Sequence, residues 1–267
     1  MKTMAIAYDF DGTLAPGYMQ EHSFFPELGV NPKEDFWPYV GKFAEEHDMD
    51  EILAYMNLML HEATHKRISI KKESFINHGK GLKFFPGVEG WFKRINDYAK
   101  GEGVEIKHYI VSSGLREMIQ GTSIAHEFDY IFASGFVYNR DGVAIWPALA
   151  VNYTNKTQYL FRINKGIINS WDSKSINRYT PDKERPIPFE NIIYIGDGET
   201  DVPAMKMTRH NDGTAVAVYD PDKPESKIAA DKLLTQERAD HSVKADYRDG
   251  SELEKIIKNF ISKVGHK

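Results

Sequence analysis

Short apolar runs that end in polar residues recur along this chain and alternate with segments of helical periodicity. The first run, Met4 to Tyr8, leads into Asp9-Phe10-Asp11-Gly12-Thr13, and further runs span 106–111, 191–195 and 215–219. Runs of this length without polar alternation are typical of strands buried on both faces of a parallel sheet. Strands separated by helices favour an α/β fold with a doubly wound, mainly parallel sheet.

Three of these apolar runs are followed at once by side chains that can take part in chemistry. In parallel sheets the carboxyl ends of the strands meet at one edge, and ligands bind in the crevice there. We therefore expect one site that draws on all three strand ends. Its members are Asp9 and Asp11 after the first run, Ser112 and Ser113 after the second, and Asp197 and Asp201 after the third.

The rest of the chain predicts the helices that cover such a sheet. Apolar residues at helical spacing indicate helices over 49–65, 88–100, 156–165, 224–235 and 251–264. The segment between the first two strands is mostly helical, and residues 130–146 read as strand, turn and strand. Residues 166–188 are polar and irregular. Aromatic residues are frequent between 24 and 43, and a packed core explains them better than a substrate cage.

Composition narrows the class of protein and its surroundings. The chain has 267 residues, a net charge of −5 and no cysteine, so disulfides and a thiol nucleophile are excluded. We expect a cytoplasmic protein that binds neither nucleic acid nor membrane, because no basic run, signal peptide or long apolar segment is present. The sequence does not determine the oligomeric state.

The acidic residues after the first and third apolar runs suggest a site for a hard cation. Asp9 and Asp11 lie two residues apart and leave an extended chain on the same side, and Gly12 allows a tight turn. Asp197 and Asp201 lie in Gly-Asp-Gly-Glu-Thr-Asp, whose carboxylates can bind Mg²⁺ through oxygen. Either motif alone is common in turns, but their placement after neighbouring strands makes the pair informative.

In type and order, Asp9 to Thr13, Ser112, a lysine and Asp197 to Asp201 resemble the four motifs of the haloacid dehalogenase (HAD) superfamily. The resemblance covers almost the whole chain. The insertion between the first two motifs is similar to that of the helical-cap branch, which includes phosphoserine phosphatases. The resemblance implies a Rossmann-like HAD core of residues 1–14 and 83–267 and a small helical cap of residues 15–82.

The resemblance also implies roles for individual residues. Asp9 would be the nucleophile that forms an aspartyl-phosphate, and Asp11 would be the general acid and base. A carboxylate that attacks a phosphate dianion meets like charge, so Mg²⁺ and a lysine are needed. Mg²⁺ would be held by Asp9, Asp11, Asp197 and Asp201. Catalysis would add Ser112 and Lys156, with Lys165 as the other possible lysine, and substrate contacts would add Thr13, Ser113 and Gly114.

These residues predict a Mg²⁺-dependent phosphatase acting on a small phosphorylated metabolite. Phosphoserine phosphatases present a glutamate and an arginine from the cap to the substrate, and this chain has no clear match for either. Glu21 is near the expected position but out of register, and Arg67 is a candidate only because it is an arginine of the cap. The substrate is therefore left at a small phosphomonoester.

Three alternatives remain open from the sequence. The same core serves a phosphotransferase when a second hydroxyl replaces water, and it also serves a regulatory protein without activity. His61-Glu62-Ala63-Thr64-His65 matches the H-E-x-x-H pattern of zinc metallopeptidases. Against the peptidase, Lys66 and Arg67 follow at once and no third ligand is evident.

Overall fold

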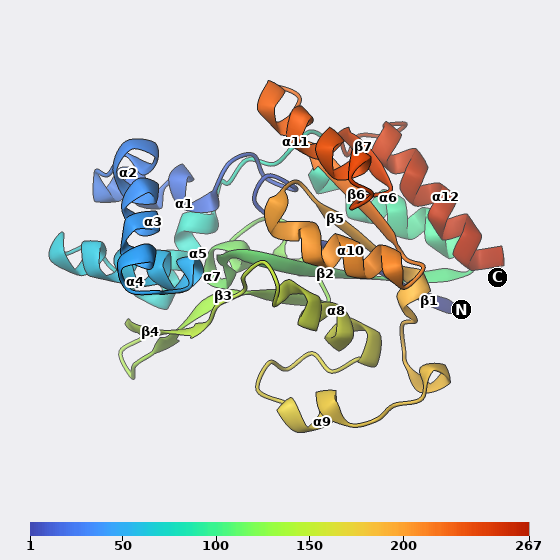
Figure 1. Cartoon of the computed structure of the whole chain (residues 1–267), viewed down its shortest axis with the longest axis horizontal. Coiled ribbons are helices and arrows are strands. Elements are labelled where there is room, and N and C mark those ends of the chain that lie inside the picture. The colour runs from blue at the N-terminus through green and yellow to red at the C-terminus, as the bar shows by residue number, and fades with distance from the viewer. Residues whose placement is uncertain (267) are drawn as a thin grey trace.

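A seven-stranded sheet with the order β4-β3-β2-β1-β5-β6-β7 forms the centre of the molecule. The computed structural model describes residues 1–266. All neighbouring strands run parallel except β3 and β4, which form an antiparallel hairpin at one edge (Figure 1). The strands are β1 Lys2–Tyr8, β2 Val104–Leu115, β3 Tyr130–Tyr138, β4 Ala144–Leu149, β5 Ile192–Gly196, β6 Thr214–Tyr219 and β7 His241–Lys244. The predicted α/β class with a mainly parallel sheet is confirmed.

Strand β1 lies in the middle of the sheet because both of its faces are apolar. Met4, Ile6 and Tyr8 face a cluster shared with helices α6 Val88–Gly101 and α12 Glu252–His266. Ala5 and Ala7 face a second cluster shared with α8 Lys156–Lys165 and α10 Val202–His210. Successive side chains of a strand point to opposite faces, so the run Met-Ala-Ile-Ala-Tyr requires helices on both sides. The large residues face one layer, and the alanines let the other layer approach.

The remaining helices complete these two layers and the connections. The further helices of residues 83–266 are α7 Arg116–Gln120, η2 Ala125–Glu127, α9 Ser173–Asn177, η3 Asp182–Glu184, η4 Phe189–Asn191, η5 Glu199–Asp201 and α11 Pro224–Thr235. Helices α10 and α11 pack beside β6, and α7 packs beside β2 and β3.

Residues 15–82, the inserted segment, form a helical layer beside the sheet edge and appear in blue to cyan in Figure 1. Its two ends lie side by side, since the Phe85 N–H donates to the Leu14 carbonyl at 2.9 Å. Buried aromatic residues, among them Phe24, Phe25 and Phe36, fill its interior. Its helices are α1 Met19–His22, α2 Phe24–Leu28, the π-helix η1 Pro32–Phe36, α3 Trp37–Glu46, α4 Glu51–His65 and α5 Lys72–Gly79.

Two glycines attach the inserted segment to the core. A Cβ on Gly79, the last residue of α5, would lie 1.8 Å from the Met118 carbonyl oxygen of α7. A Cβ on Gly121, just after α7, would lie 1.8 Å from the Ile76 carbonyl oxygen of α5. The two helix backbones therefore touch, and only glycine fits at either position.

Three features depart from the sequence expectations. Strand β2 extends beyond the predicted 106–111 because Val104 and Glu105 pair with β1, and because Ser112 and Leu115 pair with β3 on the two sides of a register shift. Strand β7 was not predicted, since only Val243 of its four residues is buried. Residues 166–188 contain the short helix α9, whose N-cap Asp172 accepts a hydrogen bond from the Ser175 N–H at 2.9 Å.

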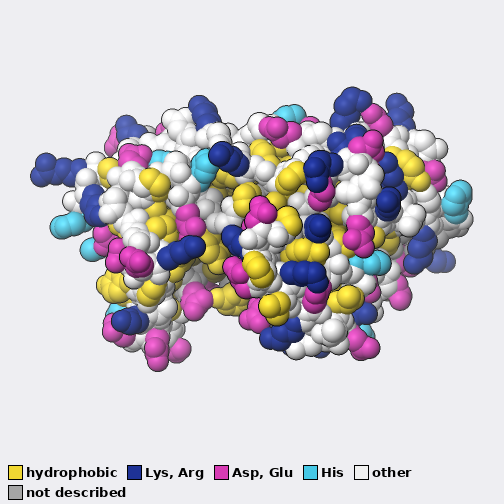
Figure 2. All heavy atoms as spheres, turned by 90° about the horizontal axis from the view of Figure 1, so that it is seen from above, with side chains coloured by type: hydrophobic (Ala, Val, Ile, Leu, Met, Phe, Trp, Pro, Cys, Tyr) yellow, Lys and Arg dark blue, Asp and Glu magenta, His cyan; other side chains and the backbone are white. Residues whose placement is uncertain are grey.

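The surface carries charges of both signs. In the face shown in Figure 2, Lys and Arg side chains are interspersed with Asp and Glu, and the outline is indented between the two parts of the molecule. Within residues 1–266, no helix combines the length and apolar character needed to span a bilayer.

A buried chain of hydrogen bonds crosses the layer beneath β1. The Trp91 Nε1–H donates to the Tyr8 hydroxyl at 2.9 Å, and that hydroxyl lies 3.0 Å from His108 Nδ1. His108 Nε2 lies 3.1 Å from Asn96 Oδ1, so the tautomer with the proton on Nε2 satisfies every group. Burial lowers the pKa of His108 to about 3 from an ordinary 6.5. The imidazole is therefore held neutral.

Stability should fall on acidification because of His108. The unfolded chain takes up a proton at this residue below about pH 6.5, whereas the folded chain resists until about pH 3. The unfolding free energy should therefore decrease as pH falls through this window, by up to about 1.4 kcal/mol per pH unit. Denaturant titrations of wild type and His108→Gln between pH 6.5 and 4 measure it. Equal slopes in the two proteins would contradict the assignment, whatever their absolute stabilities.

Candidate active site

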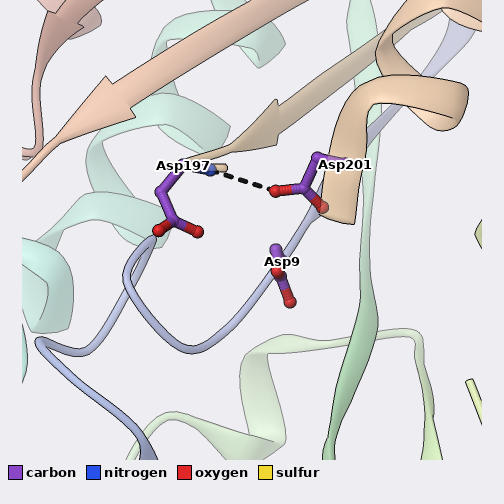
Figure 3. A group of neighbouring side chains, drawn as sticks. All are labelled: Asp9, Asp197 and Asp201. Atoms are coloured by element: carbon purple, nitrogen blue, oxygen red, sulfur yellow. Dashed lines mark hydrogen bonds between the residues drawn. The ribbon is translucent and has the colours of Figure 1, made fainter. Parts of the chain in front are cut away.

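Three aspartates meet where β1 and β5 end. Asp9 directly follows β1, Asp197 directly follows β5, and Asp201 closes the short helix η5. One ligand oxygen from each can be chosen so that all three lie within 4.8 Å of one another. Figure 3 shows the three side chains close together, with the Asp201 carboxylate accepting a hydrogen bond from the Asp197 N–H. Among residues 1–266 this is the one place where three side chains capable of binding a metal come together.

A buried lysine joins two of these carboxylates. Lys156 Nζ lies 2.8 Å from Asp9 Oδ2 and 2.6 Å from Asp201 Oδ1. Its side chain is fully buried, although it is the first residue of α8. Lys165, at the other end of α8, instead donates to the backbone carbonyls of Ile176 and Arg178. Of the two lysines, therefore, Lys156 lies at the aspartates and Lys165 does not.

Asp201 uses all of its hydrogen-bonding capacity within the protein. Oδ1 accepts from Lys156 and from the Tyr194 hydroxyl, the latter at 2.6 Å. Oδ2 accepts from the backbone N–H groups of Asp197 and Gly198 at 3.1 and 3.4 Å. A carboxylate offers about four lone-pair sites, and these four donors occupy them. Asp201 therefore holds the loop after β5 in shape and leaves Asp9 and Asp197 as the more available ligands.

Glycine is required where the two loops approach each other. Gly12 has φ +74°, and a Cβ there would lie 2.2 Å from Asp197 Oδ2. A Cβ on Gly196 would lie 2.3 Å from Asp201 Oδ2. The Thr13 hydroxyl also donates to Asp197 Oδ1 at 3.3 Å. The Gly-Thr after the Asp-x-Asp motif thus sets the distance between the two loops, and the glycine before Asp197 lets Asp201 fold back against the end of β5.

Asp11 lies near Asp9 in the chain and is held by a residue of the inserted segment. Its Oδ1 accepts a hydrogen bond from the Met19 N–H at 3.0 Å, which leaves Oδ2 free. Ser112 lies across the same cavity, and its Oγ accepts from the Gly114 N–H at 3.1 Å. The Ser113 carbonyl accepts from the Tyr55 hydroxyl at 2.6 Å. The polar residues in the last part of β2 therefore line the same cavity as those after β1.

The electrostatics of the cluster are dominated by burial and crowding of acids. Burial raises the pKa of Asp9 to about 6, although Lys156 opposes the shift. Burial and neighbouring carboxylates raise the pKa values of Asp11 and Asp197 well above their usual range. Burial alone would lower the pKa of Lys156, but Asp201 and Asp9 outweigh it and raise the pKa. One buried cation thus stands against four carboxyl groups.

A cavity of about 610 Å³ opens above these residues, between the inserted segment and the sheet edge. The core contributes Asp9, Ser112 and Asp197 to its lining, and the inserted segment contributes Gln20, Trp37 and Tyr55. Of the aromatic residues expected to pack as core, Phe24, Phe25 and Phe36 are buried, whereas Trp37 reaches the cavity. This size is suited to a small ligand.

Sequence reasoning missed several residues of the site. Tyr194 supports Asp201 from within an apolar strand, and its phenol was the only polar group in Ile-Ile-Tyr-Ile. Gln20, Tyr55 and Tyr153 line the cavity, and no local pattern distinguished them from other surface or core residues.

The H-E-x-x-H motif lies on α4, away from the aspartates. His61 has a side chain that is 74% exposed, and its Nδ1 lies 3.8 Å from the neighbouring Glu62. Within residues 1–266, no third metal-ligating side chain joins His61 and His65. The motif is part of an exposed helix face in this structure.

The model of the haloacid dehalogenase-like hydrolase family matches residues 6–206. This chain belongs to that family. An uncharacterized protein of Borreliella burgdorferi is 31% identical to this chain over an alignment of 278 positions, which covers 94% of this chain and 93% of the relative.

Solved structures share the fold. A HAD family hydrolase of Salmonella enterica superposes with a TM-score of 0.58 at 20% identity, over 89% of this chain and 66% of that one. A phosphoserine phosphatase in apo form superposes with a TM-score of 0.59 at 18% identity, over 96% of this chain and 98% of that one. A phospho-aspartyl intermediate analogue of phosphoserine phosphatase gives 0.57 at 18% identity, over 97% and 99%. The expected HAD core, like that of phosphoserine phosphatases, is thus confirmed.

Gly12 and Gly17 provide a matched pair for testing the packing of the two loops. Both have positive φ, at +74° and +71°, so alanine imposes similar backbone strain of about 1 kcal/mol at each. Only at Gly12 would the new methyl overlap a carboxylate, since the nearest atom to a Cβ on Gly17 is 3.9 Å away. We expect Gly12→Ala to lower the unfolding free energy by at least about 2 kcal/mol more than Gly17→Ala. Similar losses by denaturant titration would argue against the close approach.

Proposed function

We propose that this HAD-like hydrolase is a Mg²⁺-dependent phosphatase that acts on a small phosphomonoester through an aspartyl-phosphate on Asp9. The observation that carries the proposal is that Asp9 and Asp197 meet at the floor of a cavity while the buried Lys156 contacts Asp9 from beneath it. A nucleophilic carboxylate, a cation beside it and hard oxygen ligands are what phosphoryl transfer to an aspartate requires.

Asp9 has the geometry of a held nucleophile in this proposal. Its Oδ1 accepts the Phe10 N–H at 2.7 Å and its Oδ2 accepts Lys156. These bonds fix the carboxylate and leave lone pairs toward the cavity. In the first step an Asp9 oxygen forms a bond to phosphorus as the bond from phosphorus to the leaving oxygen breaks.

Asp11 would supply and then recover the proton. Burial and the charge of Asp9 raise its pKa, so it carries a proton when substrate arrives. The Met19 N–H occupies Oδ1, so the proton resides on Oδ2 and passes to the leaving oxygen. Asp11, now ionised, takes a proton from the water that attacks phosphorus. Phosphate leaves, and both carboxyl groups return to their starting states.

The residues of the cluster fit a magnesium ion. Asp9 and Asp197 offer hard oxygen atoms, and burial together with neighbouring carboxylates raises the pKa values of Asp9, Asp11 and Asp197, so a cation among them would be favourable. A bound Mg²⁺ supplies charge stabilisation to the transferring phosphoryl group. Lys156 and the Ser112 hydroxyl would bind the phosphoryl oxygens, with Thr13, Ser113 and Gly114 near them. Asp201 would position Lys156 and the Asp197 loop.

The inserted segment, residues 15–82, would act as a cap on a core of residues 1–14 and 83–267. It supplies one wall of the cavity, and its two connections to the core lie together at Leu14 and Phe85. Because Gly79 and Gly121 hold α5 against the core, a motion that admits substrate and then excludes water would involve the helices ahead of α5. A phosphotransferase would use the same groups with an alcohol in place of water. No observation favours the zinc peptidase, because His61 and His65 lack a third ligand within residues 1–266.

Phosphate release should require both Mg²⁺ and Asp9. We expect p-nitrophenyl phosphate and small phosphomonoesters to be hydrolysed with Mg²⁺, and hydrolysis to stop with chelator or in Asp9→Asn. Asp9→Asn keeps the size of the side chain but cannot form the acyl phosphate. A folded, Mg²⁺-loaded wild type that releases phosphate from none of these esters would sink the phosphatase proposal. Activity that depends instead on His61 and zinc would redirect it to the peptidase.

The two lysines of α8 should differ sharply. Lys156→Met removes the cation at Asp9, and we expect kcat/KM to fall by about 10²- to 10³-fold. Lys165→Met is the matched control, because the same change at the other end of the helix removes only contacts to backbone carbonyls. It should stay within about threefold of wild type. Circular dichroism of both variants checks that the fold is retained. A larger loss in Lys165→Met than in Lys156→Met would reverse the assignment.

A further inference from the structure

The part of the cavity next to Asp11 reveals what kind of leaving group it accepts. The α1 helix begins at Met19, whose N–H holds Asp11, and the next residue is Gln20. Asp11, Gln20 and Tyr55 all line this cavity. The group that departs from phosphorus must leave toward Asp11, so it lies against Gln20 and Tyr55.

Gln20 presents an unsatisfied acceptor there. Its side chain is 2% exposed and lines the cavity, and its Oε1 has no hydrogen-bond partner within the protein. A buried amide oxygen without a donor costs roughly 1–3 kcal/mol, so such a group points to a ligand that supplies one. A ligand that carries an N–H or O–H at this position would satisfy it.

Aromatic rings continue the wall beyond Gln20. Trp37 lies between two tyrosines. Its ring centroid is 5.1 Å from that of Tyr18 and 5.9 Å from that of Tyr55. Tyr153 adds a fourth ring from the core side, and its hydroxyl donates to Glu51. The faces of such rings are attractive to cations.

The charge of this wall is negative and uncompensated. Glu21 accepts the Trp37 Nε1–H at 2.9 Å and Glu51 accepts Tyr153, yet neither forms an ion pair with any residue in 1–266. Lys223 is the one cation among the side chains described as lining the cavity, and it pairs with Asp220 at 3.5 Å. A carboxylate on the leaving group would find no free cation here, whereas an ammonium would meet acceptors, rings and carboxylates.

We propose that the substrate is the phosphomonoester of a small amino alcohol, whose leaving group carries a primary ammonium and no carboxylate. The ammonium donates to Gln20 Oε1 and lies against Trp37 and Tyr55, within the field of Glu51. Gln20 is then a specificity residue rather than a catalytic one. The inference rests on the proposed phosphatase activity for its chemistry but concerns only the leaving group.

Two esters of the same shape test the inference. O-phosphoethanolamine and propyl phosphate differ only in an ammonium against a methyl group. With Mg²⁺, kcat/KM should be at least tenfold higher for O-phosphoethanolamine, and O-phosphoserine should be the poorer substrate of the two amino esters. The proposal would be overturned if kcat/KM for O-phosphoethanolamine were no higher than that for propyl phosphate, or if O-phosphoserine were preferred to O-phosphoethanolamine.

Matched variants assign the preference to Gln20. Gln20→Leu removes the acceptor with little change of size and should reduce the ratio at least threefold. Gln120→Leu makes the same change at an exposed site on α7, outside this cavity, and should keep the wild-type ratio. The same ratio in the two variants would remove Gln20 from the proposal. Glu51→Gln, which keeps an acceptor and removes a charge, should also lower the ratio.

The failure of this inference is distinguishable from failure of the phosphatase proposal. If p-nitrophenyl phosphate is hydrolysed with Mg²⁺ and Asp9 while the two alkyl esters are used equally, the chemistry stands and the leaving-group inference falls. If no ester is hydrolysed, calorimetric titration of Mg²⁺-loaded Asp9→Asn with both esters still tests whether the site prefers an ammonium on the leaving group. The amine should bind at least tenfold more tightly, and equal affinities would overturn the inference.

Discussion

The buried ammonium of Lys156 is the interaction on which the arrangement of the site depends. It connects α8 to the loops after β1 and β5 through Asp9 and Asp201, and none of the three groups is more than slightly exposed. Removing one partner of such a set leaves an uncompensated charge, which typically costs about 3–5 kcal/mol. Correct docking of three separate elements is therefore coupled to correct placement of one charge. The helix layer formed by α8 and α10 cannot shift along the sheet without breaking it.

Much of the core was accessible from the sequence because its signals are local. The apolar runs that became β1, β5 and β6 are buried on both faces, and the acids that follow β1 and β5 meet as parallel strand ends must. The choice between Lys156 and Lys165 was not local. Both sit on the same ten-residue helix, and what separates them is that the first turn of α8, not its last, faces the strand ends. Helical periodicity alone does not reveal that direction.

The residues that were missed depend on contacts between distant parts of the chain. Tyr194 looked like one more large residue of a strand, yet its hydroxyl reaches Asp201. Gln20 and Tyr153 come from the two sides of the cavity, more than a hundred residues apart, and neither carries a motif. Strand β7 was not predicted because it is an edge strand with a single buried side chain, and its sequence contains no apolar run. The core chemistry thus follows from local patterns, whereas the walls of the cavity follow from tertiary packing.

The touching backbones of α5 and α7 bear on how this protein and its relatives can diverge. Gly79 and Gly121 leave no space for a methyl group, so the foot of the inserted segment is fixed to the core. Drift in sequence is tolerated where side chains face solvent or a ligand, which here means α1, α3 and the start of α4. A lineage can therefore acquire a new substrate by changing those helices while the joint at α5 stays the same. Packing therefore constrains the contact between α5 and α7, whereas the side chains of α1, α3 and the start of α4 are free to change.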